Sequence, residues 1–150
     1  MIIRWLFAAI HLLALGIGLG AAWARSRALR QSLDAAGLQR VFTADAWWGI
    51  AALLWLSTGL VRLFGALEKT TSWYFHNHVF LLKMALFLVI VVLELAPMRT
   101  FIRWRAAVRR GELPDTTRAM SLSRVSALQA ALVMAMVFAA TAMARGLGAR

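Results

Sequence analysis

The chain has 150 residues, of which 62% are hydrophobic and only 15% are charged, and its mean hydropathy is +0.72. These values lie outside the range of ordinary soluble domains and indicate an integral membrane protein. The absence of cysteine excludes disulfides, thiolate metal ligands and thiol redox chemistry.

Four segments are apolar over about 20 residues, the helix length that crosses a hydrocarbon core of ~30 Å. They are residues 3–23, 46–64, 75–97 and 125–144, here called spans one to four. Span one resembles a secretory signal in its early Arg4 and its small residues 21–24, but its apolar run is longer than a signal core, so we expect it to be retained as a helix.

No repeat and no low-complexity linker divides residues 1–150, so we expect one transmembrane domain. Backbone groups in lipid must pair within each segment, which predicts an all-α, four-helix bundle. Gly16 and Gly20 in span one are four residues apart, a spacing typical of close contact with another helix, either inside the bundle or in a dimer.

Between spans three and four, residues 98–110 (MRTFIRWRAAVRR) follow Pro97 and precede Gly111. Apolar side chains gather on one side of a helical wheel, which predicts a short basic helix lying in the membrane interface. Its lipid-headgroup arginines would be Arg103, Arg105, Arg109 and Arg110. The alternative is a solvated loop whose arginines only fix the topology.

The net charge of +11 comes from 17 Lys and Arg against 6 Asp and Glu. Most arginines fall in the connections between spans one and two and between spans three and four, which lie on the same side of a four-span protein. The positive-inside rule makes that side cytoplasmic, so both termini should be periplasmic or external. Anionic lipid headgroups therefore explain the charge better than nucleic acid does.

Ionisable residues near the inner boundary form a predicted inner layer of Arg25, Arg27, Asp45, Glu94 and Arg99. Asp45 lies near the expected start of span two, where a carboxylate favours the positive helix end. Glu94 can pair with a cytoplasmic arginine. We interpret this layer as structural.

A second, outer layer contains His11, Arg62, His76, Asn77, His78 and Lys83. Lys83 and His11 lie deep in their spans, where ionisable groups are expensive and are functional candidates. On a continuous span-three helix His76 would share a face with Lys83, whereas His78 would point roughly 200° away from His76. We therefore favour His76 over His78 as the partner of His11, with snorkelling of Lys83 to the headgroups as the alternative.

The outer layer has several functional interpretations. Two histidines on facing helices can ligate a b-type haem, which would use His11 with His76 or His78 and would place Lys83 and Arg62 beside the cofactor. A histidine packed among polar groups is the alternative. The sequence contains no phosphate-binding loop, no HExxH motif and no serine–histidine–acid set, so no catalytic residue is predicted.

Several stretches together resemble a known family: HLLALGIGLGAAWARSRALR (11–30), TADAWWGIAALLWLSTGLVRLFG (43–65), WYFHNHVFLLKMALF (73–87), LELAPMRTFIRWR (93–105) and MARGLG (143–148). This family is an uncharacterised bacterial inner-membrane family with four helices, domain-of-unknown-function family 2214. The resemblance implies a multi-pass protein of the bacterial inner membrane but no activity. Its pattern marks His11, Arg25 or Arg27, Asp45, Arg62, Asn77, Lys83 and Arg105.

More distantly, His11, Gly20, Arg27 and Lys83 are similar to a pattern in the haem-binding membrane protoporphyrinogen oxidase family. That family has a histidine two residues before the lysine, where this chain has Leu81.

Three functions follow as hypotheses. The first is an accessory or structural subunit that associates with other membrane proteins or with itself. The second is a b-type haem redox protein, and the third is a small proton or solute carrier. We favour the first, and we expect His11, Lys83 and Arg62 to bind an anionic group or a water cluster.

Overall fold

The computed structural model describes residues 2–65 and 71–147, and the regular secondary structure of these residues is entirely helical. The helices are α1 (Ile2–Ala28), α2 (Ala35–Phe64), α3 (Thr71–Phe75), α4 (His78–Arg109) and α5 (Ala119–Ala144). All but α3 are long and apolar enough to cross a membrane. The all-α prediction with four spans is confirmed.

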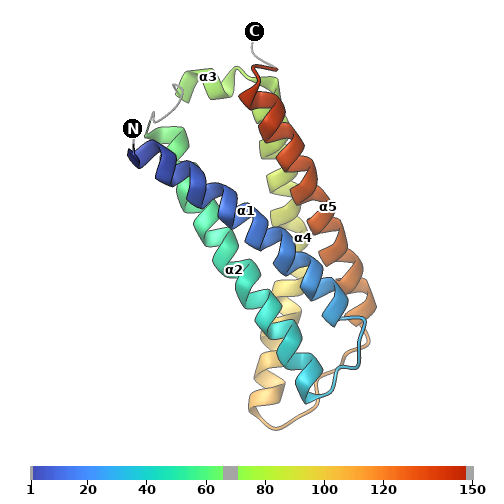
Figure 1. Ribbon diagram of the computed structural model, residues 1–150. Coiled ribbons are helices and arrows are strands. Elements are labelled where there is room, and N and C mark those ends of the chain that lie inside the picture. Colours follow the sequence, from blue (N-terminus) through green and yellow to red (C-terminus); the bar gives the residue numbers. More distant parts are fainter. Residues whose placement is uncertain (1, 66–70, 148–150) are drawn as a thin grey trace.

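The four long helices form two antiparallel pairs. α1 packs against α2 and also against α5, and α5 packs against α4. Figure 1 shows the pair α1/α2 diverging from the pair α4/α5 toward the end where α3 lies and where the chain begins and ends. We call this the terminal end, and we call the opposite end, with the connections 29–34 and 110–118, the loop end.

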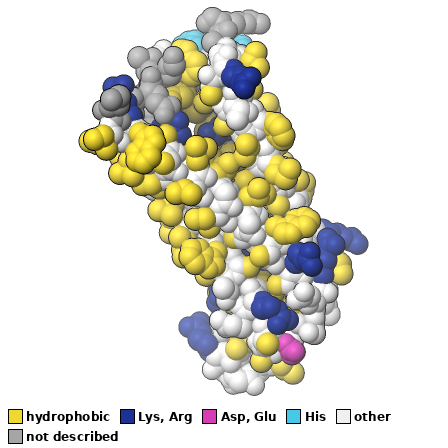
Figure 2. Space-filling view, viewed as in Figure 1, with side chains coloured by type: hydrophobic (Ala, Val, Ile, Leu, Met, Phe, Trp, Pro, Cys, Tyr) yellow, Lys and Arg dark blue, Asp and Glu magenta, His cyan; other side chains and the backbone are white. Residues whose placement is uncertain are grey.

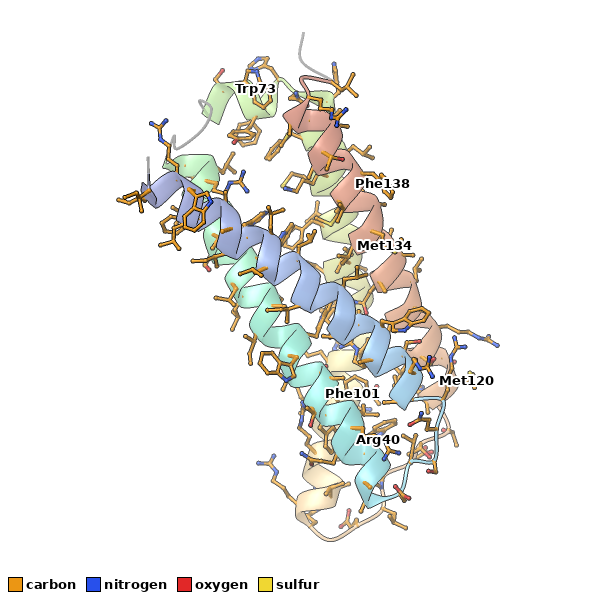
Figure 3. The ribbon with its side chains drawn as sticks, in the orientation of Figure 1. Arg40, Trp73, Phe101, Met120, Met134 and Phe138 are labelled. Carbon is orange, nitrogen blue, oxygen red and sulfur yellow. The ribbon has the colours of Figure 1, made fainter. Side chains whose placement is uncertain are left out.

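The surface of the bundle is apolar around its middle. Leu53 is 70% exposed, Val92 65% and Phe138 72%. Hydrophobic side chains cover the middle of the face in Figure 2, with Lys and Arg toward its ends, and Met134 and Phe138 point away from the bundle in Figure 3. A water-soluble monomer rarely exposes such a surface, whereas hydrocarbon solvates it.

The second long helix begins earlier than the sequence predicts, at Ala35 instead of residue 46. Asp34 caps it, because its Oδ1 accepts the backbone N–H of Gly37 at 2.8 Å. A Cβ on Gly37 would lie 1.9 Å from the carbonyl oxygen of Ser32, so only glycine fits this turn. The prediction that Asp45 lies near the helix start is wrong, since Asp45 is well inside α2.

The third span also differs in its bounds. Asn77 interrupts the predicted 75–97 helix and caps α4, with Oδ1 accepting the backbone N–H groups of Val79 and Phe80 at 3.0 and 3.1 Å. Residues 98–109 are helical, as expected, but they continue α4 through Pro97 without a break and do not form the separate short helix that the sequence predicts. The 32 residues of α4 are ~48 Å long at ~1.5 Å each, so the helix extends beyond a hydrocarbon core of ~30 Å.

The basic segment of α4 packs onto the loop end of the bundle. Phe101 is fully buried and Trp104 is 3% exposed, in a cluster with Leu38 and Val41 of α2. Trp104 Nε1 donates to the carbonyl of Asp115 at 3.0 Å and holds the following loop. In that loop the Thr117 N–H donates to the Asp115 carboxylate and lowers the pKa of that carboxyl. Gly111 follows α4 with φ of 75°, a conformation that suits glycine.

The close approach of α1 to its neighbours does not use the predicted glycines. A Cβ on Gly18 would lie 3.5 Å from the Cβ of Ala51, whereas a Cβ on Gly16 or Gly20 would have no described atom within 4 Å. Gly16 and Gly20 therefore face away from the described bundle.

Candidate functional site

Arg25, near the end of α1, lies at the centre of the inner polar layer. Its side chain is fully buried, and each of its five N–H hydrogens has an acceptor. Nε donates to Ser126 Oγ at 3.0 Å, Nη1 to Asp45 Oδ1 at 2.8 Å and Glu94 Oε1 at 2.9 Å, and Nη2 to Glu94 Oε2 at 2.8 Å and Gln129 Oε1 at 2.7 Å. One guanidinium thus joins α1, α2, α4 and α5.

The two carboxylates of this layer have further partners. Asp45 Oδ2 accepts Arg105 Nη2 at 2.9 Å, and Glu94 Oε2 accepts Gln129 Nε2 at 2.8 Å. The layer therefore contains two guanidinium groups and two carboxylates, which balance in charge. The Arg25 guanidinium also lies 5.3 Å from the Trp48 ring centroid and 5.7 Å from that of Phe101.

The sequence predicted this layer in part. Arg25, Asp45 and Glu94 meet as expected, but Arg27 and Arg99 are exposed and lie outside it. Arg105, which was assigned to lipid headgroups, belongs to the layer through Asp45. This residue is only 36% exposed at its side chain and also stacks on Phe42.

Sequence reasoning missed the contribution of α5. Gln129 and Ser126 are fully buried, and a buried glutamine in an apolar helix was the signal that could have identified it. One turn nearer the loop end, Ser26 and Ser123 exchange hydroxyl-to-carbonyl hydrogen bonds of 2.9 Å in each direction, and Arg30 Nε donates to Ser123 Oγ at 2.8 Å. These bonds tie α1 to α5.

The second polar site is a cavity of about 540 Å³ between the diverging helix pairs, here called the terminal cavity. Most of its lining is apolar and comes from all five helices. Trp73, labelled in Figure 3, contributes from α3. The side chains on its wall that carry polar atoms are those of His11, Trp55, Arg62, Trp73, Tyr74, Lys83 and Thr141. His11, Arg62 and Lys83 therefore come together as predicted.

His11 is held in one orientation on this wall. Its Nδ1 lies 2.9 Å from Thr58 Oγ1, and its ring stacks on Trp55 with centroids 5.3 Å apart. The Thr58 hydroxyl donates to the Leu54 carbonyl at 2.6 Å, so its oxygen is left to accept the Nδ1 hydrogen of His11. Nε2 is then the ring nitrogen that remains for a ligand. A Cβ on Gly59 would lie 3.3 Å from His11 Cε1, so glycine there makes room for the imidazole.

Lys83 and Trp55 approach each other across the cavity. Lys83 Nζ lies 5.5 Å from the Trp55 ring centroid, a cation–π distance. The Trp55 ring also contacts Phe87 at 5.0 Å between centroids. Trp55 Nε1 is buried, and no described residue accepts its hydrogen. Buried donors without an acceptor are uncommon in native proteins.

The structure does not bring the other predicted outer residues to the cavity. His76 and His78 are exposed, and His76 Nδ1 lies 2.8 Å from the Ser72 carbonyl oxygen. The prediction that His76 shares a helix face with Lys83 is wrong, because α4 begins at His78. Asn77 is buried as the cap of α4. His11 therefore has no second histidine beside it for a two-histidine haem site.

The remaining basic residues of α4 are on the surface. Arg103, Arg109 and Arg110 are exposed, and Arg110 pairs with Glu112 at 2.9 Å. No cluster of three or more His, Cys, Asp or Glu side chains suited to a metal ion occurs among residues 2–65 and 71–147.

Residues 3–148 match a family described as "Predicted membrane protein (DUF2214)". The chain belongs to this family. The match spans all four long helices and both polar sites, so the buried arginine layer and the terminal cavity are features of a DUF2214 protein. No match was found among curated proteins or among solved structures.

Proposed function

We propose that this membrane protein binds an amphipathic small molecule in the terminal cavity, with an apolar body and an anionic, oxygen-rich head. The observation that carries the proposal is the cavity itself. Its volume of about 540 Å³ lies within the ~300–1,000 Å³ typical of small-molecule sites, and its wall is mostly apolar with a few convergent polar groups.

The polar groups on the wall define the head. Trp55 Nε1 supplies a buried N–H that needs an acceptor, and Lys83 and Arg62 supply cationic donors nearby. Carboxylate and phosphate oxygens accept hydrogen bonds from indole and cationic donors alike. His11, fixed by Thr58 and Trp55, adds Nε2 as a further contact. A fatty acid or a single-chain phospholipid has this combination of head and body.

The test is native mass spectrometry of the protein in mild detergent, titrated with oleate, lysophosphatidate or the neutral monoolein. Wild-type protein should retain the two anions and release monoolein. The variants His11→Phe and Lys83→Met should lose at least about tenfold in affinity, since a hydrogen bond to a charged group contributes about 1.5–3 kcal/mol.

The matched control is His78→Phe, which makes the same substitution at an exposed position outside the cavity. It should bind as wild type does. Equal binding by His11→Phe, Lys83→Met and His78→Phe would contradict the proposal, and so would a preference for monoolein.

An accessory role beside other membrane proteins is a second proposal. Gly16 and Gly20 on α1 are exposed and have no described atom near a Cβ position, which leaves a smooth strip that another helix can approach. Gly16→Leu with Gly20→Leu should abolish co-purification of a partner or of a second copy. If the glycine and leucine forms assemble equally, this role is excluded.

We also propose the bacterial inner membrane as the location, with the loop end cytoplasmic and the terminal end periplasmic. The exposed Arg27, Arg99, Arg103, Arg109 and Arg110 all lie toward the loop end, as the positive-inside rule requires, and can contact anionic headgroups. Tags placed at the two termini should both be accessible from the periplasm. Two cytoplasmic tags would mean that the orientation is the opposite one. Tags on opposite sides of the membrane would contradict the four-span topology.

A further inference from the structure

A second, smaller space of about 60 Å³ lies between the four long helices, on the side of the terminal cavity that faces the loop end. Its lining contains no charged side chain and consists of residues such as Gly18, Trp48, Ala51 and Ile90. We call it the apolar pocket. This volume exceeds the about 10–15 Å³ that one water-sized group needs, so the pocket has room for the end of a hydrocarbon chain.

The apolar pocket adjoins the terminal cavity. Leu15, Trp55, Phe87 and Met136 line both spaces. A chain that enters the terminal cavity with its head near Lys83 would pass between these four side chains to reach the middle of the bundle. An apolar space with no polar partner for water stays dry and takes apolar groups.

The far end of the apolar pocket meets the buried arginine layer. Trp48, on its wall, lies under the Arg25 guanidinium at 5.3 Å. Ile90, also on its wall, gives its carbonyl to Gln129 Nε2 at 3.3 Å. Because all five N–H hydrogens of Arg25 are bonded to side chains of α2, α4 and α5, a methyl terminus cannot pass without breaking these hydrogen bonds. The pocket is therefore closed at this end, here called its floor, by Trp48 and Ile90 against the arginine layer.

We propose that the apolar pocket receives the end of a single unbranched hydrocarbon chain and sets the maximum chain length that the protein accepts. This inference rests on the proposed function, since it assigns the tail of the ligand whose head lies in the terminal cavity. Head recognition by Lys83 and length selection by the floor at Trp48 and Ile90 would be separable properties.

Gly18→Ala tests the length limit with a small change. The new methyl would lie 3.5 Å from Ala51 Cβ and 3.8 Å from Trp48 Cζ3, which is ordinary contact, so the bundle can keep its packing. It would lie against Ala51 and Trp48 of α2, two residues that line the pocket. Gly20→Ala is the matched control. Gly20 lies on the same helix as Gly18, but a methyl there would have no described atom within 4 Å.

Affinities for straight-chain fatty acids from laurate to stearate are measured by native mass spectrometry for wild type, Gly18→Ala and Gly20→Ala. Gly18→Ala should lose about fourfold in affinity for the longest acid that wild type accepts, the equivalent of about one methylene, and should bind laurate unchanged. Gly20→Ala should follow the wild-type profile. Ala52→Leu, at an exposed position that also lines the pocket, should shorten the preferred chain further.

Two outcomes overturn the inference, and they are distinguishable. If all variants bind the acids with the same length profile, the tail lies elsewhere, while the head site and the proposed function stand. If wild type binds none of the acids and no lysophosphatidate, the proposed function fails and the length limit fails with it.

Discussion

Replacing Arg25 by methionine tests the interpretation of the buried arginine layer as the connection between the four spans. Methionine keeps an unbranched apolar side chain in the bundle but removes all five N–H donors. Asp45 would keep Arg105 as a partner at 2.9 Å, whereas Glu94 would keep only the Gln129 amide at 2.8 Å. The variant therefore leaves the Glu94 carboxylate without an opposite charge.

The size of the effect follows from this imbalance. Removing one partner of a buried ion pair costs about 3–5 kcal/mol of stability, because the other charge stays buried. The side chain of Glu94 is 20% exposed and that of Asp45 14%, so some solvent reaches the carboxylates. We expect a loss near the lower bound, about 3 kcal/mol, or about 150-fold in the folding equilibrium constant.

The measurement is unfolding in mixed micelles of mild detergent and dodecyl sulfate, followed by circular dichroism and tryptophan fluorescence. Arg27→Met is the matched control, because Arg27 is an exposed arginine on the same helix, two positions away. Its free energy of unfolding should change by less than about 0.5 kcal/mol.

A second variant separates the charge effect from lost packing. Adding Glu94→Gln to Arg25→Met removes the unpaired carboxylate, so the double variant should recover at least about 1 kcal/mol. If Arg25→Met loses no more stability than Arg27→Met, the layer does not hold the spans together. If the double variant is as unstable as the sum of the single variants, the loss comes from packing and the charge argument is refuted.

Three further predictions concern the terminal end. Gly59→Ala brings a methyl to 3.3 Å from His11 Cε1, so it should displace the imidazole and weaken oleate binding by several-fold while the helix content in circular dichroism stays unchanged. Asn77→Ala removes the cap of α4 and should cost about 0.5–2 kcal/mol of unfolding free energy in the micelle assay. Purified protein incubated with haem should show no Soret band of a two-histidine haem, because neither His76 nor His78 lines the cavity that holds His11.

Each of these has a result that would count against it. Unchanged oleate affinity in Gly59→Ala would mean that the position of His11 does not matter to the ligand. Asn77→Asp should restore the stability lost in Asn77→Ala, since aspartate also caps, and equal loss in both would contradict the capping role. A reduced-minus-oxidised spectrum of a low-spin b-type haem that disappears in His11→Phe would overturn the exclusion of a haem pair.

The number of the spans and the nature of their environment were predictable from the sequence. Apolar runs such as residues 125–144 can be identified without tertiary structure, because hydrocarbon requires a contiguous apolar length whatever the neighbours are. The helix bounds were less predictable. Asp34 and Asn77 act as caps through side-chain geometry, and the continuation of α4 through Pro97 depends on packing of Phe101 and Trp104 at the loop end.

The sequence by itself determined that the few ionisable residues along the spans need partners, since unpaired charges in lipid are costly. It grouped Arg25 with Asp45 and Glu94, and His11 with Arg62 and Lys83, by their depth alone. Only the tertiary structure decided which neighbours enter each group: Arg25 but not Arg27, Arg105 as a network member, Gln129 from α5, and neither His76 nor His78. Depth follows from the rise per residue along one helix, whereas the direction of a side chain depends on how each helix is rotated against the others, and that rotation is fixed by packing between segments far apart in the chain.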